Sequence, residues 1–193
     1  MTSQNSIRMC TLNGFLAACV VLFGAVVAQS QTFASHSDKG GAPKVGDLAP
    51  DFSVQDFKGE KFTLSTLTKR RAVLLWFTNL CEGCQSKISE VLELKSLYER
   101  KGVDVVAVSV LGKDRKTVED IIRTKNVTFQ FLYDPNGEAT ERYSGQYIEG
   151  TCPLKNILII DKGGKITYSA HLPGVREQEL TTQLENIVRG VKE

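Results

Sequence analysis

Two periods of hydrophobic positions alternate along the chain and predict its elements. Apolar runs and period-two alternation predict strands, because a central strand is covered on both faces and an outer strand on one. The predicted strands are residues 52–56, 61–64, 72–77, 103–110, 129–133, 157–160 and 165–170. Apolar residues spaced three and four apart predict helices. The predicted helices are residues 65–69, 84–101, a segment capped by Asp114 or Thr117, 138–143 and 177–191.

The order of these elements predicts an α/β fold. A β-hairpin comes first, strands and helices then alternate, and a second hairpin and a helix follow. Strand–helix–strand units require parallel strands with right-handed crossovers, and the late hairpin adds antiparallel strands. We therefore expect a central mixed β-sheet flanked by helices on both faces, with an N-terminal β-hairpin.

Composition and charge narrow the class of protein. The chain has 193 residues, of which 41% are hydrophobic and 24% are charged, which is typical of a globular domain with a substantial core. The formal net charge is +2, too small for the basic surface that nucleic-acid binding requires. We therefore expect no nucleic-acid partner.

The N-terminal residues resemble a targeting segment. An apolar stretch at residues 15–28 follows Arg8, and no acidic residue occurs before Asp38. This pattern is typical of a secretory signal peptide, with small residues before a cleavage site after Ala28. A second cleavage site after Ala34 and an uncleaved N-terminal anchor are the alternatives.

The leader sets the expected domain organisation and location. Residues 1–28 are predicted to be the signal peptide or anchor, residues 29–44 a flexible polar linker, and residues 45–193 the folded domain. We expect a periplasmic or otherwise extracytoplasmic protein, tethered to the membrane only if the leader remains uncleaved. A lipid anchor at Cys19 is less favoured because the apolar run continues past that residue.

Two cysteines lie where a buried strand turns into a helix. Cys81 and Cys84 form a C-x-x-C pattern directly after the strand at residues 72–77. Free N–H groups at a helix N-terminus favour a thiolate, so Cys81 is predicted to be nucleophilic and Cys84 to close a disulfide with it. A zinc site would need further paired ligands, and the other candidates, Cys152, His36 and His171, are not in a paired motif. We therefore expect no metal; an inert cysteine pair is the remaining alternative.

Residues 45–193 resemble the TlpA/ResA type of exported thiol–disulfide oxidoreductase, within the peroxiredoxin-like superfamily. The resemblance depends on the Ala-Pro-Asp-Phe sequence at 49–52, the C-x-x-C, and the segments 102–109 and 159–166. It implies a thioredoxin-like fold and disulfide exchange through Cys81 and Cys84 without a cofactor. It also implies a protein disulfide or dithiol substrate and an external thiol–disulfide electron partner.

The resemblance assigns further site residues, with departures from the family pattern. Glu82 and Gly83 between the cysteines would tune the redox potential. Such enzymes usually carry Trp before the first cysteine, where this chain has Leu80. Many carry an acid three residues after the second cysteine; here Lys87 stands there, either facing the dithiol or simply solvated.

A cis-proline opposite the dithiol is also implied. Pro153 is the candidate, which would place the preceding thiol, Cys152, beside Cys81 where substrate backbone binds. Cys152 is then either a third functional thiol or a small buried hydrophobic residue.

Two other activities use the same cysteines. A peroxiredoxin-like peroxidase would use Cys81 as its peroxidatic cysteine: Thr78 matches that pattern, whereas Leu74 replaces its Pro and Lys155 its Arg. A soft-metal carrier would bind copper through Cys81, Cys84 and Cys152, with only His171 as an added ligand. The resembling copper-assembly proteins space their two cysteines one residue wider and add a dedicated His, whereas here only His171 is available, after the late strand, so disulfide exchange is favoured.

Overall fold

The computed structural model describes residues 41–190. The predicted leader, residues 1–28, lies outside the described residues, as does the predicted linker before residue 41. The strands are β1 (Ser53–Asp56), β2 (Lys61–Thr63), β3 (Ala72–Thr78), β4 (Val103–Ser109), β5 (Gln130–Tyr133), β6 (Ile157–Ile160) and β7 (Ile166–Ala170). The helices are α1 (Leu64–Thr68), α2 (Glu82–Ser86), α3 (Ile88–Tyr98), η1 (Glu99–Lys101), α4 (Arg115–Thr124), α5 (Glu138–Ser144), η2 (Leu172–Gly174) and α6 (Glu177–Arg189).

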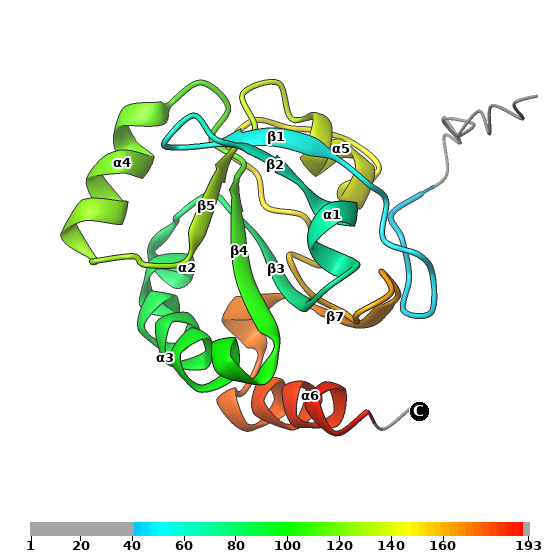
Figure 1. The fold of residues 1–193 in the computed structure, drawn as a ribbon. Coiled ribbons are helices and arrows are strands. Elements are labelled where there is room, and N and C mark those ends of the chain that lie inside the picture. Colours follow the sequence, from blue (N-terminus) through cyan, green and yellow to red (C-terminus); the bar gives the residue numbers. More distant parts are fainter. Residues whose placement is uncertain (1–40, 191–193) are drawn as a thin grey trace, which may run out of the picture. The chain divides into compact units, whose positions relative to one another are not determined.

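The strands form one mixed sheet in the order β2-β1-β5-β4-β3-β6-β7, seen in Figure 1. β3, β4 and β5 are parallel, as their helical crossovers require. β1 pairs antiparallel with β2 and β5, and β6 pairs antiparallel with β3 and β7. The predicted mixed α/β sheet is confirmed.

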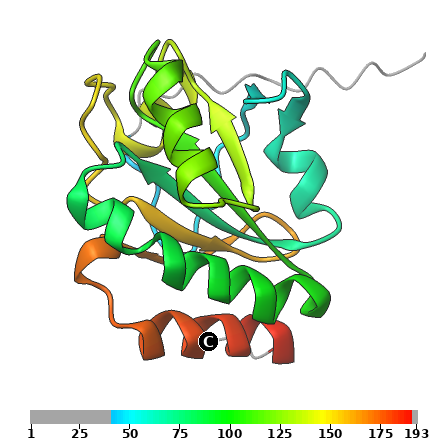
Figure 2. The same cartoon turned by 90° about the vertical axis from the view of Figure 1, so that its left-hand side faces the viewer.

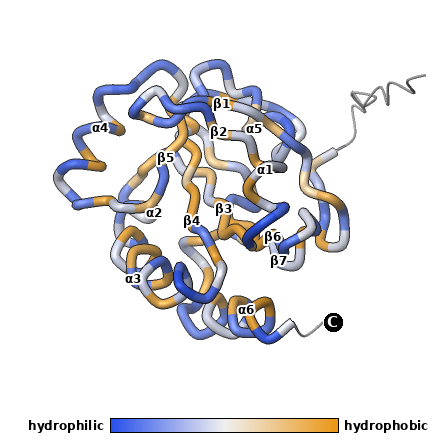
Figure 3. Tube along the Cα trace, in the orientation of Figure 1, coloured by the Kyte–Doolittle hydropathy of each residue, from blue (hydrophilic) through white to orange (hydrophobic). Residues whose placement is uncertain are grey.

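Helices cover both faces of this sheet. One face packs against α3, α4 and α6, and Figure 2 shows α3 and α6 lying side by side. The opposite face packs against α1 and α5. The side chains of β3 are buried along its whole length, as expected for a strand covered on both faces. In Figure 3 the hydrophobic residues gather accordingly on the inner strands and on the inward sides of the helices.

The predicted helix at residues 84–101 is divided into three segments. Lys87 has φ −89° and ψ −7°, and it both ends α2 and precedes α3. The apolar stripe of α3 agrees with the sequence prediction, because Ile88, Val91 and Leu94 are buried. The segment that carries the cysteines is therefore a helix of only 5 residues, separate from the helix that packs on the sheet.

The strand directions bring two segments that are distant in the sequence together at the carboxyl end of β3. β3 ends at Thr78, directly before the C-x-x-C. Because β6 runs antiparallel to β3, its first residue, Ile157, lies opposite Trp76. The N–H of Phe77 donates to the carbonyl of Asn156 at 2.8 Å. The loop before β6, which contains Cys152 and Pro153, therefore meets the turn that carries Cys81.

Candidate active site

Cys81 and Cys84 lie one turn apart at the start of α2. Cys81 is the residue before the helix, has extended backbone, and is exposed. Cys84 is 1% exposed and packs against the core beneath the sheet edge. Both are free thiols in the described structure. One sulfur is thus open to a substrate, while the second lies behind it.

The turn between β3 and α2 has an unusual backbone. Leu80 has φ 55°, in the left-handed region that costs a non-glycine residue free energy, yet its side chain is only 3% exposed. Its N–H donates to Thr78 Oγ1 at 3.0 Å, and the N–H of Cys81 donates to Asn79 Oδ1 at 3.1 Å. These bonds and the burial of Leu80 hold Cys81 at the surface.

Cys152 is tied directly to this turn. The backbone N–H of Asn79 donates to Cys152 Sγ at 3.1 Å, and Asn79 Nδ2 donates to the carbonyl of Gly150 at 2.9 Å. Cys152 is partly buried. The structure therefore places all three cysteines of the described chain around one turn.

The sulfurs of Cys84 and Cys152 perturb each other. The pKa of Cys84 is raised far above its ordinary value, mainly by its hydrogen bond to Cys152 and by burial. The pKa of Cys152 is lowered, mainly because the Cys84 thiol donates a hydrogen bond to it. The two shifts have opposite signs, so Cys152 loses its proton more readily than Cys84 does.

Thr78 contacts the buried cysteine. Its side chain is completely buried, and its hydroxyl lowers the pKa of Cys84, opposing the larger effects of Cys152 and burial. A hydroxyl that accepts from Leu80 can still donate its own proton to the sulfur of Cys84. Thr78 was matched to the peroxidase pattern by its spacing from Cys81. In the structure its hydroxyl acts on Cys84 and on the backbone of the turn.

The expected cis-proline is wrong. The structure has no cis peptide bond among residues 41–190, so the bond before Pro153 is trans. Trans is favoured by about 0.5–1 kcal/mol at such bonds, and only tertiary constraint reverses this preference. Here Thr151 N–H donates to the carbonyl of Ile148 at 3.0 Å, so the loop closes without the cis isomer. Pro153 is nevertheless buried, directly after Cys152.

The two residues between the cysteines lie at the surface. Glu82 is exposed in the first turn of α2. A Cβ at Gly83 would lie 3.8 Å from Pro173 and 4.0 Å from Cys81 Sγ, so Pro173 of η2 borders the dithiol. The absence of a side chain at Gly83 keeps this border close to the reactive sulfur.

Lys87 makes structural contacts. Its Nζ donates to Glu90 Oε2 at 2.6 Å and to the carbonyl of Val175 at 3.1 Å. The ion pair is largely buried, with side chains 20% and 13% exposed. Lys87 therefore joins α3 to the segment before α6, which agrees with neither the dithiol-facing nor the solvated alternative.

The features expected of the other two activities are scattered. Lys155 is exposed, and so is His171. Residues 41–190 contain no group of three or more His, Cys, Asp or Glu side chains placed to hold a metal ion. The structure thus brings the three cysteines of the copper alternative to one turn, whereas its added ligand, His171, lies exposed at the protein surface.

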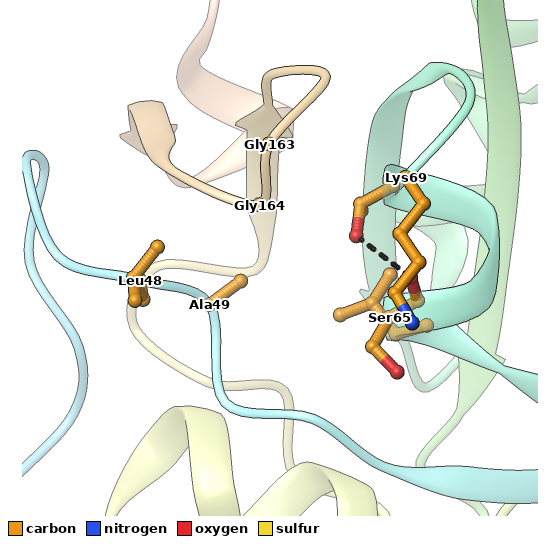
Figure 4. Close-up of a pocket in the computed structure, with 8 residues that line it drawn as sticks. Leu48, Ala49, Ser65, Lys69, Gly163 and Gly164 are labelled. Carbon is orange, nitrogen blue, oxygen red and sulfur yellow. Dashed lines mark hydrogen bonds between the residues drawn. The ribbon is translucent and has the colours of Figure 1, made fainter.

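A hollow of about 210 Å³ lies at the other end of the sheet. Figure 4 shows its walls: Leu48 and Ala49, Ser65 and Lys69 of the α1 region, and the glycines of the β6–β7 turn. β6 ends opposite Val73, the second residue of β3, whereas the dithiol follows the last. The hollow is thus separate from the sulfurs.

Sequence reasoning missed Asn79, Asn156 and Pro173. Asn156 is fully buried, and its Oδ1 accepts the N–H of Leu172 at 2.8 Å. A polar residue directly beside a buried strand, as Asn79 and Asn156 both are, was the available signal. Pro173 gave no signal, because only the packing of η2 brings it to Gly83.

The fold and the arrangement of the sulfurs define a thioredoxin-like redox protein. The chain belongs to the AhpC/TSA family, which matches residues 45–169. It is 29% identical over 125 residues to the thiol-disulfide oxidoreductase ResA of Geobacillus thermodenitrificans, covering 65% of this chain and 68% of that protein. It is 25% identical over 173 residues to ResA of Bacillus cereus, covering 89% and 91%. The predicted resemblance is confirmed.

Solved structures support the same fold. The thioredoxin domain of a thiol-disulfide oxidoreductase from Bacteroides vulgatus superposes with a TM-score of 0.63 at 20% identity, covering 76% of this chain and 99% of that one. Peroxidoxin BcpB of Mycobacterium tuberculosis superposes with a TM-score of 0.62 at 19% identity, covering 78% and 99%. The fold is thus shared by a protein named as a thiol-disulfide oxidoreductase and by one named as a peroxidoxin.

Proposed function

We propose that this protein is an exported thiol–disulfide oxidoreductase that exchanges electrons with protein disulfides through Cys81 and Cys84. One observation carries the proposal: Cys81 is exposed before α2 while Cys84 is buried one turn behind it. This arrangement gives a nucleophile that a substrate can reach and a second thiol that only the first sulfur can meet. The names of the ResA relatives point to the same chemistry.

The reaction begins at the exposed sulfur. The thiolate of Cys81 attacks one sulfur of a substrate disulfide, forming a mixed disulfide and releasing the other substrate sulfur as a thiolate. The buried thiol of Cys84 then attacks Cys81 Sγ. The second substrate sulfur leaves with the proton from Cys84, and the enzyme carries a Cys81–Cys84 disulfide. An external dithiol partner must reduce that disulfide before the next cycle.

Two exposed apolar residues of the loop before β6 are candidate contacts for a polypeptide substrate. Leu154, next to Pro153, is 93% exposed, and Ile148 in the same loop is 53% exposed. Exposed apolar side chains in a loop joined to the reactive turn favour protein contact. The loop before β6 therefore supplies apolar contacts, and Cys81 supplies the reactive atom.

The test is a paired assay of the full chain with a protein disulfide and with hydrogen peroxide. Cys81→Ser should abolish disulfide reduction, and Cys84→Ser should accumulate mixed disulfides seen on non-reducing gels. Unchanged turnover in either variant would reject the scheme. If hydrogen peroxide is consumed much faster than disulfides, the peroxidase alternative replaces it.

Export is proposed from the leader pattern at residues 1–28. Within residues 41–190, no helix has the length and apolar character needed to cross a membrane. N-terminal sequencing of the protein recovered from the extracytoplasmic fraction should begin after Ala28. Recovery of the intact N-terminus in the membrane fraction would establish an anchor instead, and recovery in the cytoplasm would exclude export.

A further inference from the structure

The sulfur of Cys152 lies in a set of hydrogen-bond donors that the exchange described above does not use. The backbone N–H of Asn79 donates to it at 3.1 Å. In the reduced protein the sulfur of Cys84 also lowers the pKa of Cys152, but a Cys84 held in a disulfide has no proton to donate, so the N–H of Asn79 is the donor that remains. Donors directed at a sulfur stabilise its thiolate form, which is the nucleophile in disulfide exchange.

Asn156 supplies an independent observation. Its side chain is completely buried, and its Nδ2 has no hydrogen-bond partner of normal geometry among the described residues. The pKa of Cys152 is lowered first by the Cys84 thiol and also, to a smaller degree, by this amide. This buried amide is therefore close enough to affect the sulfur of Cys152, and no hydrogen bond among the described residues satisfies its nitrogen.

Cys84 is near both other sulfurs. Cys152 and Cys81 each change its pKa, Cys152 most strongly, and Cys152 packs against the hydrophobic cluster that contains Cys84. Exposure decreases from Cys81 through Cys152 to Cys84. The buried thiol can thus pair with either neighbour, whereas only Cys81 is open to a substrate.

We propose that Cys152 is a third redox-active thiol, which takes over the disulfide bond from Cys81 by attacking Cys84. The inference rests on the proposed Cys81–Cys84 chemistry. The thiolate of Cys152 attacks Cys84 Sγ of the oxidised pair. The Cys84–Cys152 bond forms, the Cys81–Cys84 bond breaks, and Cys81 leaves as a thiolate. No electrons are gained or lost, so no additional oxidant or reductant is needed.

This exchange gives the oxidised enzyme a free nucleophile. With Cys84 bonded to Cys152, Cys81 still attacks substrate disulfides, but the thiol that would release the substrate is occupied. The mixed disulfide then persists until another thiol of the substrate attacks it, which rearranges the substrate disulfides without net reduction. The Cys84–Cys152 state therefore favours isomerisation over reduction.

Disulfide mapping of the full-length protein tests the bond itself. Wild type, Cys81→Ser and Cys81→Ser/Cys152→Ser are equilibrated in glutathione buffers of graded potential, alkylated and digested, and linked peptides are identified by mass spectrometry. We expect a Cys84–Cys152 peptide in Cys81→Ser and its loss in the double variant. The proposal would be overturned if Cys84 and Cys152 of Cys81→Ser were both recovered as free, alkylated thiols at every potential at which wild type forms the Cys81–Cys84 disulfide.

An activity ratio separates this proposal from the proposed function. Isomerisation of a scrambled disulfide protein is measured against its reduction in wild type, Cys152→Ser and Cys152→Ala. We expect both variants to lose isomerisation severalfold relative to reduction. Equal ratios in all three would reject the role of Cys152 while leaving the dithiol enzyme intact. A wild type that closes Cys84–Cys152 yet reduces no protein disulfide would instead reject the proposed function alone.

Discussion

The backbone N–H of Asn79 donates a hydrogen bond to the sulfur of Cys152, 73 positions further along the chain. The bond joins the turn before the dithiol to the loop before β6. Because the N–H belongs to the backbone, it persists in variants of the side chain at position 79 and remains directed at residue 152. The electrostatic coupling between the sulfurs is therefore a property of the fold at this edge of the sheet.

Removing either neighbour of Cys84 should shift its pKa, in opposite directions. The hydrogen bond with Cys152 raises the pKa of Cys84, and that with Cys81 lowers it. Cys152→Ala should therefore lower the pKa of Cys84, whereas Cys81→Ala should raise it. Alkylation rates of Cys84 as a function of pH, followed by peptide mapping, measure both shifts. Shifts of equal sign would contradict the described arrangement of the three sulfurs.

The same coupling predicts how stability depends on pH. A thiol whose pKa is raised by folding contributes stability that is complete below its unfolded pKa of about 8.5 and is lost as the pH rises towards the folded value. Cys84 is such a thiol. Cys152→Ala removes the largest cause, so this variant should lose less stability than wild type above that unfolded value, where Cys152 with its lowered pKa is ionised in both states and no longer contributes. Denaturant unfolding at several pH values measures the difference, and a steeper alkaline loss in the variant would contradict it.

Thr78→Val should destabilise the turn before the dithiol. The substitution keeps the shape of the side chain but leaves the N–H of Leu80 without its acceptor at 3.0 Å. An unsatisfied buried donor costs about 1–3 kcal/mol. Chemical denaturation should show this loss, and Thr78→Ser, which keeps the hydroxyl, should restore most of it. If valine and serine cost the same, the hydroxyl is not the stabilising group.

Lys87→Met should lower the free energy of unfolding without changing the sequence of steps at Cys81 and Cys84. The substitution leaves Glu90, whose side chain is 13% exposed, without the Nζ at 2.6 Å. Loss of one partner from a largely buried ion pair costs about 1–3 kcal/mol at this degree of exposure. Lys116→Met is the matched control, because Lys116 pairs with Asp120 while 88% exposed, and it should unfold like wild type. Equal effects of the two variants would contradict a structural role for Lys87.

Leu154→Lys should impair the use of protein substrates selectively. Leu154 is 93% exposed in the loop beside the dithiol, and Leu97, in the last turn of α3, is 52% exposed. We expect Leu154→Lys to lower kcat/KM for a protein disulfide about fivefold to tenfold, as for loss of a contact residue, and to spare a small disulfide. Leu97→Lys should leave both unchanged. A parallel fall for the small disulfide would place the effect on the chemistry instead of on docking.

The fold was largely predictable because its signals are local. Each of these buried strands is an apolar run with a glycine or a charged residue at one end, so β3, β4 and β6 were found within a residue or two. The C-x-x-C was likewise visible because strand, cysteines and helix follow one another directly. The break at Lys87 was not visible, since the apolar stripe continues across it and only the local backbone reveals it.

The relations around the sulfurs were less predictable because they join distant segments. The hydroxyl of Thr78 was assigned by spacing from Cys81, whereas its influence falls on Cys84. The isomer before Pro153 was inferred from family position, but it depends on how the preceding loop closes. The partners of Lys87 lie on α3 and before α6, and no short-range pattern could identify the second of them.

The side chain of Leu80 anchors the turn before Cys81 in the hydrophobic core. It is inserted into the hydrophobic core immediately before Cys81. The loop cannot open without exposing that side chain to water. Amide hydrogens from Thr78 to Cys81 should therefore exchange with solvent as slowly as those of the central strands. Under the proposed function, a protein substrate would therefore have to adapt its own shape to a rigid turn around Cys81.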